Sequence, residues 1–139
     1  MSLSAHLEKF VSWASEQPAI TAVALVGSCA RGTATDDSDI DLIILSSTCA
    51  PYLENHAWLS LFGDVQRSIN EQWGRVETVR AMYKTGIEIE YNFAHPSWAA
   101  VPIDPGTRRV VEGGFRILYD PQNQFDALQK TLSEDPVTR

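Results

Sequence analysis

The sequence is poor in the features that mark membrane-spanning or secreted proteins. Its 2 cysteines, Cys29 and Cys49, are too few for a zinc cluster, and we expect both to be reduced core residues. No apolar run approaches the roughly 18 residues that a membrane span needs. The N-terminal stretch MSLSAHLEKF lacks the charged and apolar regions of a signal peptide. We therefore expect a soluble, cytoplasmic protein without a membrane partner.

Positive charge is scarce as well. The chain has 11 basic and 18 acidic residues and a net charge of -7, which would repel a phosphodiester backbone. We therefore expect no long nucleic acid among its partners. Hydrophobic residues make up 44% and charged residues 21%, which is the composition of a folded globular protein. A length of 139 residues predicts a single domain over residues 1–139.

The hydrophobic pattern predicts alternating helices and strands. Helices are expected over residues 3–16 and 122–132, and, with an interruption at Gly63, over much of 53–72. Strands are expected in four stretches: AITAVALV (19–26), IDLIIL (40–45), RVETVRAMY (75–83) and GIEIEYNFA (86–94). The last two form a hairpin, and a second hairpin is expected over 108–120 with its turn at Gly113–Gly114. Together they predict an α+β (mixed α/β) domain with one twisted sheet and flanking helices.

Two aspartates stand at the start of the second strand. Asp39 and Asp41 are two residues apart, so their side chains lie on one face of the strand about 7 Å apart. Two carboxylates in one site repel each other, and a divalent cation between them removes that penalty. Magnesium suits such a site because it prefers one or two carboxylates together with phosphate oxygens. The pair therefore predicts a metal site with a phosphate nearby.

The segment before the aspartates can bind that phosphate. Gly27 and Ser28 follow a buried strand, where a glycine lets backbone amides approach an anion and the serine hydroxyl can donate a hydrogen bond. Arg31 extends the same turn, and the loop 33–38 returns the chain to the aspartates. We expect Gly27, Ser28, Arg31 and Ser38 to contact a polyphosphate.

Residues 20–45 resemble a known family signature. GSCARG, followed by DSDIDL, is similar to the pattern of the nucleotidyltransferase superfamily that includes DNA polymerase beta, in the form found in antibiotic and minimal nucleotidyltransferases. The resemblance implies a polymerase beta-like fold with a mixed sheet. It also implies that Gly27 and Ser28 bind a nucleoside triphosphate, and that Asp39 and Asp41 bind two Mg²⁺ ions.

That family uses a third carboxylate from a neighbouring strand, as a metal ligand and often as the base. Glu88 and Glu90 are again two residues apart and share a face of their strand. The alternative for this pair is a solvated face of the sheet. Relatives of similar length resemble this chain through GIEIEYNFAHPSWA, which favours Glu90, with Glu88 second. An aspartate is commoner in this role, so a glutamate here departs from the family pattern.

The resemblance implies magnesium-dependent transfer of a nucleoside monophosphate to a hydroxyl, with ATP as the expected donor and a small molecule as the expected acceptor. Two alternatives stay open. One is a protein acceptor, as in minimal nucleotidyltransferases paired with a helical toxin. The other is a nucleotide-binding module without turnover. The sequence names neither the acceptor nor the oligomeric state.

Other residues that could bind ligands have simpler expected roles. His6 is expected on the surface of the first helix. The tryptophans are expected to pack in the core, although Trp98 could stack on a nucleobase; they are Trp13, Trp58, Trp73 and Trp98. Three basic residues could line an edge that faces phosphate, namely Arg75, Arg80 and Lys84.

Overall fold

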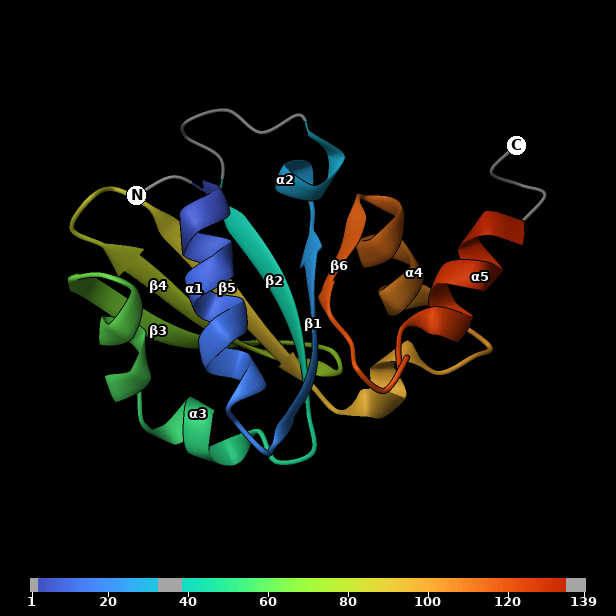
Figure 1. Cartoon of the computed structure of the whole chain (residues 1–139), viewed down its shortest axis with the longest axis horizontal. Helices are drawn as coiled ribbons and strands as arrows, with labels where there is room; N and C mark the ends of the chain where they lie inside the picture. Colours follow the sequence, from blue (N-terminus) through green and yellow to red (C-terminus); the bar gives the residue numbers. More distant parts are fainter. Residues whose placement is uncertain (1–2, 33–38, 135–139) are drawn as a thin grey trace.

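A computed structural model describes residues 3–32 and 39–134, which form one six-stranded sheet with helices on both faces (Figure 1). The elements are α1 (Leu3–Ser15), β1 (Ile20–Val26), α2 (Ser28–Arg31), β2 (Ile40–Ser46), α3 (Ala50–Glu54), η1 (Ala57–Phe62), β3 (Val65–Trp73), β4 (Val76–Tyr83), β5 (Glu88–Ala94), η2 (Pro96–Ala99), α4 (Pro105–Glu112), β6 (Phe115–Tyr119) and α5 (Asp126–Glu134). Within the described ranges, no helix has both the length and the apolar character needed to cross a bilayer.

The strand order across the sheet is β3-β4-β5-β2-β1-β6. β2 and β5 run parallel, and every other neighbouring pair is antiparallel. The sheet is therefore mixed, which confirms the predicted fold class. The four predicted strands are β1, β2, β4 and β5, and β4 and β5 form the expected hairpin. The first predicted helix is α1, and the last predicted helix, α5, begins at Asp126.

The second predicted hairpin is wrong. Residues Pro105–Glu112 form the helix α4, and only Phe115–Tyr119 form a strand. Asp104 caps this helix because its carboxylate accepts hydrogen bonds from the backbone amides of Gly106 and Thr107, at 3.0 and 3.3 Å. Pro105 occupies the first turn, where a missing amide hydrogen costs nothing. Asp104 and Pro105 therefore start a helix here, and Gly113 and Gly114 end that helix instead of forming a hairpin turn.

The helix predicted for much of residues 53–72 is also wrong in part. Short helices cover Ala50–Glu54 and Ala57–Phe62, but Val65–Trp73 is the edge strand β3. An edge strand pairs on one side only, and most of the side chains of β3 are half-buried or exposed. Its sequence consequently lacks the apolar alternation by which buried strands are found.

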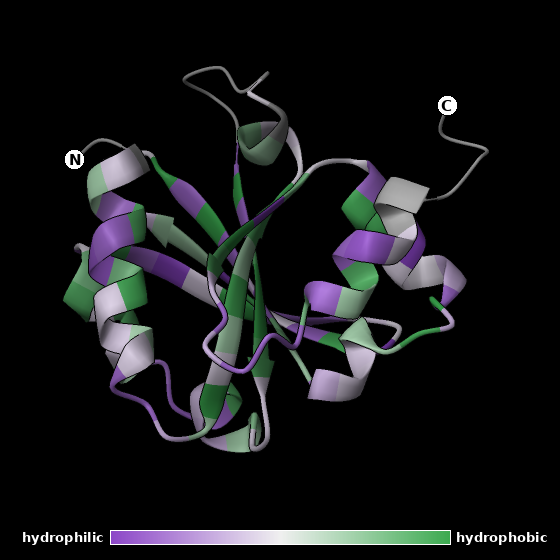
Figure 2. Ribbon diagram, turned by 45° about the vertical axis from the view of Figure 1, so that its right-hand side comes forward, coloured by the Kyte–Doolittle hydropathy of each residue, from purple (hydrophilic) through white to green (hydrophobic). Residues whose placement is uncertain are grey.

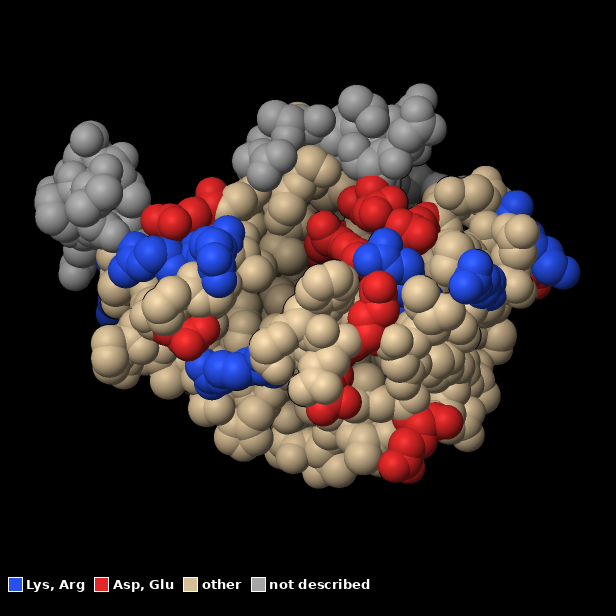
Figure 3. All heavy atoms as spheres, turned by 180° about the vertical axis from the view of Figure 1, so that it is seen from behind, with Lys and Arg blue, Asp and Glu red and all other residues tan. Residues whose placement is uncertain are grey.

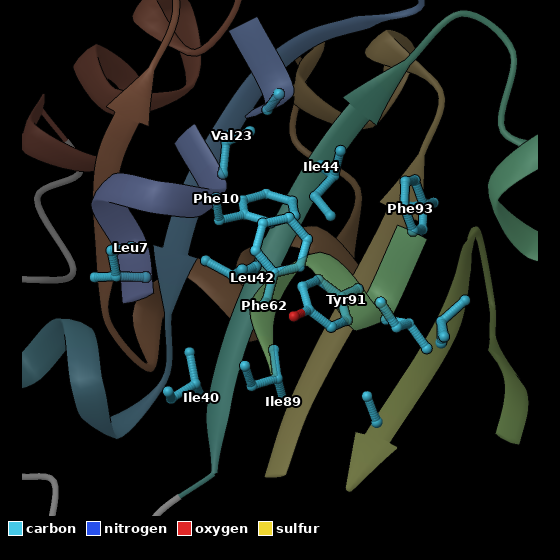
Figure 4. Packing of buried hydrophobic residues seen from close by; sticks show 14 of the residues in the cluster. Leu7, Phe10, Val23, Ile40, Leu42, Ile44, Phe62, Ile89, Tyr91 and Phe93 are labelled. Carbon is cyan, nitrogen blue, oxygen red and sulfur yellow. The ribbon is translucent and has the colours of Figure 1, made fainter. Parts of the chain in front are cut away.

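One face of the sheet is closed by a large core. Strand residues such as Leu42, Ile44 and Tyr91 pack there against Phe10 of α1 and Phe62 of η1 (Figure 4). All of these side chains are buried. Figure 2 shows the apolar stretches concentrated on the central strands, between the helices of the two layers. We call this side of the sheet the closed face.

The opposite side, which we call the open face, has a smaller core. Ala24 of β1 and Ile43 of β2 pack there with Trp98 of η2, Val111 of α4 and Leu128 of α5. The two faces alternate along each strand because successive side chains point to opposite sides. On β2, Leu42 and Ile44 belong to the closed face, and Ile43 belongs to the open face.

Two expectations about single residues are wrong. His6, expected on the surface, is only 2% exposed, because it lies against the rings of Phe62 and Tyr83 in the closed-face core. Trp73, expected in the core, is 59% exposed. It ends β3 at the tight turn into β4, where Gly74 has a positive φ of 59°, and the tip of a hairpin offers little to pack against. Trp98 is buried, as expected.

Candidate active site

Neighbouring strands bring the predicted acids together on the open face. Asp41 of β2 lies in register with Glu90 of β5, and Glu90 lies in register with Arg80 of β4. Asp39 directly precedes β2, and Glu88 begins β5. Because residues two apart share a face, each strand contributes two carboxylates to one row of the sheet.

The four acids lie as two pairs. Side-chain hydrogen bonding joins Asp41 with Glu90 and Asp39 with Glu88, and the second of these contacts raises the pKa of Glu88. In residues 3–32 and 39–134, no three acidic, histidine or cysteine side chains converge in a ready-made metal site. A metal shared by Asp39, Asp41 and Glu90 would therefore require their side chains to turn toward one point.

Asp41 is the most perturbed acid of the site. Burial, followed by the neighbouring carboxyls of Glu90 and Asp39, raises the pKa of Asp41 to about 8. Its Oδ1 atom is buried and has no hydrogen-bond partner among the described residues. A bound cation would compensate both the buried charge and the unpaired oxygen, and carboxylate oxygens are ligands that Mg²⁺ prefers. The side chains at Asp41 therefore fit a divalent metal ion.

Gly27 lies directly against this carboxylate. A Cβ atom at position 27 would be 2.9 Å from Asp41 Oδ2, and the backbone there has a positive φ of 77°. Any other residue would be strained at this φ and would also displace the aspartate. The Gly27 amide donates a hydrogen bond to the carbonyl of Gly114 at 3.3 Å, which fixes the backbone at the end of β1. The glycine thus leaves room for Asp41 within the site.

The other predicted phosphate contacts are placed in part. Ser28 is the first residue and Arg31 the last residue of the short helix α2, which directly follows Gly27. For Arg31 only the backbone is described. Ser38 belongs to residues 33–38, which lie outside the described part of the chain. Ser28 therefore begins the helix that follows Gly27, and the phosphate contacts of Gly27, Ser28, Arg31 and Ser38 all remain predictions.

Arg80 makes ion pairs with three carboxylates. Its Nε lies 2.8 Å from Glu71 Oε1, its Nη1 lies 3.2 Å from Glu88 Oε2, and its Nη2 lies 2.5 Å from Glu90 Oε1. The hydrogen bond with Glu71 is the largest of the effects that raise the pKa of Arg80. The expectation that Arg80 faces phosphate directly does not fit these contacts, since its guanidinium is already occupied by acids.

A hollow of about 880 Å³ opens beside the acids on the open face. Ile43 and Val76 of the sheet line it together with Trp98 of η2 and Val110 of α4, and Asp41 and Glu90 line it as well. Figure 3 shows this face, with acidic side chains gathered beside the hollow and basic side chains on its other side. The hollow brings apolar surface and two acids of the site into one cavity.

The sequence analysis did not predict the helix α4, which lines the side of this hollow opposite the sheet. Thr107, Arg109 and Val110 belong to α4, of which residues 108–112 were expected to be a strand. The Asp104–Pro105 start signal could have revealed this helix. Of the basic residues expected at a phosphate-facing edge, Arg75 lines the hollow and Lys84 is exposed in the turn between β4 and β5.

The nucleotidyltransferase domain family matches residues 6–83, which is more than half of the chain and includes Gly27, Ser28, Asp39 and Asp41. The chain belongs to the nucleotidyltransferase domain family. The matched region ends before Glu88 and Glu90, so the third carboxylate rests on the geometry of β5. No curated protein matches the chain by sequence.

A solved structure shares the fold of this family member. It is an aminoglycoside 6-adenyltransferase from Bacillus subtilis, with a TM-score of 0.57 and 16% sequence identity. The match takes in 71% of this chain and 37% of the other, so the chain spans little more than a third of that protein's length. At this identity the likeness establishes the polymerase beta-like nucleotidyltransferase fold and leaves the substrate open.

Proposed function

We propose that the protein is a magnesium-dependent nucleotidyltransferase that transfers a nucleoside monophosphate to a hydroxyl of a small-molecule acceptor, with ATP as the donor. The observation that carries the proposal is the half-buried Asp41 side chain with its buried Oδ1 atom. Its Oδ1 lacks a partner among the described residues, it lies beside Glu90, and the backbone of Gly27 lies against its other oxygen. Such an arrangement is costly to a protein that binds no cation there.

In this proposal, Asp39 and Asp41 hold the metal and Glu90 completes the set of ligands. Two bound Mg²⁺ ions would stabilise the charge that develops on the pyrophosphate leaving group. Gly27 leaves room for the β- and γ-phosphates beside Asp41 and Ser28 binds them, because the Gly27 amide already donates to the carbonyl of Gly114; this binding orients the α-phosphate toward the acceptor. The acceptor oxygen forms a bond to the α-phosphorus, the bond from that phosphorus to pyrophosphate breaks, and a Glu90 carboxylate oxygen takes the hydroxyl proton.

The hollow on the open face supports a small-molecule acceptor. Pockets for small molecules range from about 300 to 1,000 Å³, and this hollow of about 880 Å³ lies in that range. Glu90 lines the hollow, so an acceptor held against Ile43, Val76 and Trp98 would present its hydroxyl close to the proposed base. Glu88 does not line the hollow, which favours Glu90 for this role.

The experiment is pyrophosphate release from ATP and Mg²⁺ with a panel of hydroxyl-bearing small molecules. We expect release to depend on both the acceptor and the metal. Glu90→Gln should reduce turnover by about 10²- to 10⁴-fold, which is the usual contribution of a general base, and Glu88→Gln should reduce it less. Glu77→Gln is a matched control because Glu77 is an exposed acid of β4.

Three outcomes would count against the proposal. Release that continues in excess chelator would contradict the role of the metal. If Glu88→Gln were inactive and Glu90→Gln active, the two glutamates would exchange roles. Release that requires a protein in place of every small molecule would favour the protein-acceptor alternative.

A further inference from the structure

We propose that Arg80 is a positioning residue that keeps the Glu90 carboxylate beside Asp41, the place from which both side chains would turn to share a metal ion. The proposal rests on the proposed function, because it concerns the metal that Asp41 and Glu90 would share. Arg80 lies on β4, on the side of Glu90 away from Asp41, so it would act through Glu90 without contacting the metal.

The contacts of Arg80 are of two kinds. We call the Nε–H bond to Glu71 the anchor, and we call the contacts of Nη1 and Nη2 with Glu88 and Glu90 the fork. Glu71, on the edge strand β3, accepts the Nε–H bond at 2.8 Å and so fixes the guanidinium from the side away from the site. The two terminal nitrogens then point toward the next strand, Nη1 to Glu88 and Nη2 to Glu90. A guanidinium is planar and permanently charged, so fixing one edge also fixes the direction of its other hydrogen bonds.

Glu90 contacts both Arg80 and the proposed metal ligand Asp41. Its Oε1 atom pairs with Arg80 Nη2, while the same carboxyl group contacts Asp41. The side chains of Arg80 and Glu90 are 22% and 20% exposed, so solvent weakens the ion pair only in part. Without Arg80, the Glu90 side chain would be free to adopt other rotamers, and a metal ion would have to immobilise it on binding.

Arg80 could instead act only through its positive charge, and its removal would then have the opposite effect on metal affinity. The positive charge of Arg80 repels any cation beside Glu90, so a residue that acted only through its charge would weaken metal affinity. Removing Arg80 would then tighten metal binding. Removing a residue that positions Glu90 should weaken it, since loss of a residue that orients a metal ligand typically reduces affinity or activity by 10- to 100-fold.

The test is the dissociation constant of Mn²⁺ for the full chain without nucleotide, measured by isothermal titration calorimetry. Arg80→Gln should weaken Mn²⁺ binding by about 10- to 100-fold. Arg80→Lys keeps the charge but loses the fork, so it should fall between Arg80→Gln and the wild type. Glu71→Gln should weaken binding by a smaller factor, because it loosens only the anchor. Arg67→Gln is the matched control: it removes one positive charge from an exposed position of β3 and should change Mn²⁺ affinity less than twofold.

A double-mutant cycle tests whether Arg80 acts through Glu90. On a Glu90→Gln background, Arg80→Gln should have little further effect on Mn²⁺ affinity. A full additive effect would overturn the proposal. So would Mn²⁺ binding by Arg80→Gln that is as tight as in the wild type, or tighter.

Failure of the proposed function gives a different result, because a wild-type chain that binds no Mn²⁺ would overturn both proposals together. If Arg80→Gln does not fold, which circular dichroism in chelator would reveal, Arg80→Lys and Glu71→Gln still decide the question. Under the proposal both weaken Mn²⁺ binding relative to Arg67→Gln, and equal affinities would overturn it.

Discussion

The two faces of the sheet are built from the same strands but have different chemistry. On β5, Ile89, Tyr91 and Phe93 belong to the closed face and are almost fully buried, while Glu88 and Glu90, which alternate with them, point to the open face. The closed face is filled by aromatic rings, whereas the open face keeps a hollow of about 880 Å³ beside its acids. Because strand residues alternate, one element supplies both a core and a candidate site.

The larger hydrophobic core and the acids of the candidate site therefore lie on opposite faces of the sheet. The hydrophobic contacts of the closed face can position β2 and β5 regardless of what the acids of the open face bind. Substitutions of core residues on the closed face should therefore mainly change the free energy of unfolding, and substitutions of the acids on the open face should mainly change ligand binding and turnover.

The largest expected effect is on the open face. Asp41→Asn keeps the shape of the side chain but removes the charge that would hold a metal, so turnover should fall by at least about 10³-fold, or several kcal/mol. In chelator its free energy of unfolding, from urea denaturation, should equal or exceed that of the wild type, because the amide carries no negative charge for burial and the neighbouring carboxyls to destabilise. A variant that loses several kcal/mol of stability would show that the two faces are not separable.

The next largest effect is on the closed face. Phe10 is fully buried, and its ring centroid lies 5.3 Å from those of both Phe62 and Tyr91. Phe10→Ala should lower the free energy of unfolding by about 3–5 kcal/mol, which urea denaturation would measure. The variant that remains folded should bind nucleotide with wild-type affinity. A strong loss of affinity in the folded variant would contradict the separation of the faces.

A buried histidine makes the closed face sensitive to acid. Tyr83 donates a hydrogen bond to the carbonyl of Leu59, Tyr91 pairs with Tyr83 at 2.9 Å, and His6 Nε2 lies 3.5 Å from the Tyr91 hydroxyl. Burial, with a smaller contribution from Lys9, lowers the pKa of His6 from 6.5 to about 4. The folded protein therefore holds His6 neutral at a pH where the unfolded chain would protonate it.

The sign of the pH effect follows from this difference. The stability associated with neutral His6 is fully present above pH 6.5, and it falls as the pH drops from 6.5 to about 4, by about 3 kcal/mol in total. Urea denaturation of the wild type and of His6→Phe across this range isolates the effect, because all other titrating groups are common to both proteins. A constant difference between the two curves would show that His6 does not titrate in this way.

The smallest of these effects is expected at Gly27. Gly27→Ala places a methyl group 2.9 Å from Asp41 Oδ2 at a positive φ, so the free energy of unfolding should fall by about 1–2 kcal/mol. Gly32→Ala is a matched control because Gly32 has a similar φ of 76° but no atom of the described residues lies within 4 Å of the added methyl group. Only Gly27→Ala should also weaken Mn²⁺ binding. An equal affinity in both variants would remove Gly27 from the site.

The four inner strands and the edge strand β6 were predictable from the sequence, and the edge strand β3 and the helix α4 were not. β1, β2, β4 and β5 have regular apolar patterns, and the spacing of Asp39 with Asp41 and of Glu88 with Glu90 placed each pair on one face. The polar edge strand β3 has no such pattern. At residues 105–119 the capping aspartate and the proline were less conspicuous than Gly113–Gly114, which led to a hairpin in place of α4.

The order and register of the strands within the sheet could not be predicted from the hydrophobic pattern of each strand. That Asp41 lies opposite Glu90, and Glu90 opposite Arg80, depends on the order β4-β5-β2 within the sheet. This order arises from the pairing of strands that are distant in sequence, and local periodicity carries no information about it. The contacts of Arg80 with three carboxylates and the hollow bounded by α4 became visible only in the assembled fold.

The most direct test of the account is whether the open face binds a nucleoside triphosphate through a divalent metal ion. The measurement is the free energy of unfolding of the wild type with ATP, once with Mg²⁺ and once with excess chelator. With Mg²⁺ and ATP at about 100 times its dissociation constant, we expect a gain of about 2.7 kcal/mol, and in chelator this gain should largely disappear. An equal gain in chelator would contradict the account, because the acids of the open face would then have no metal to hold.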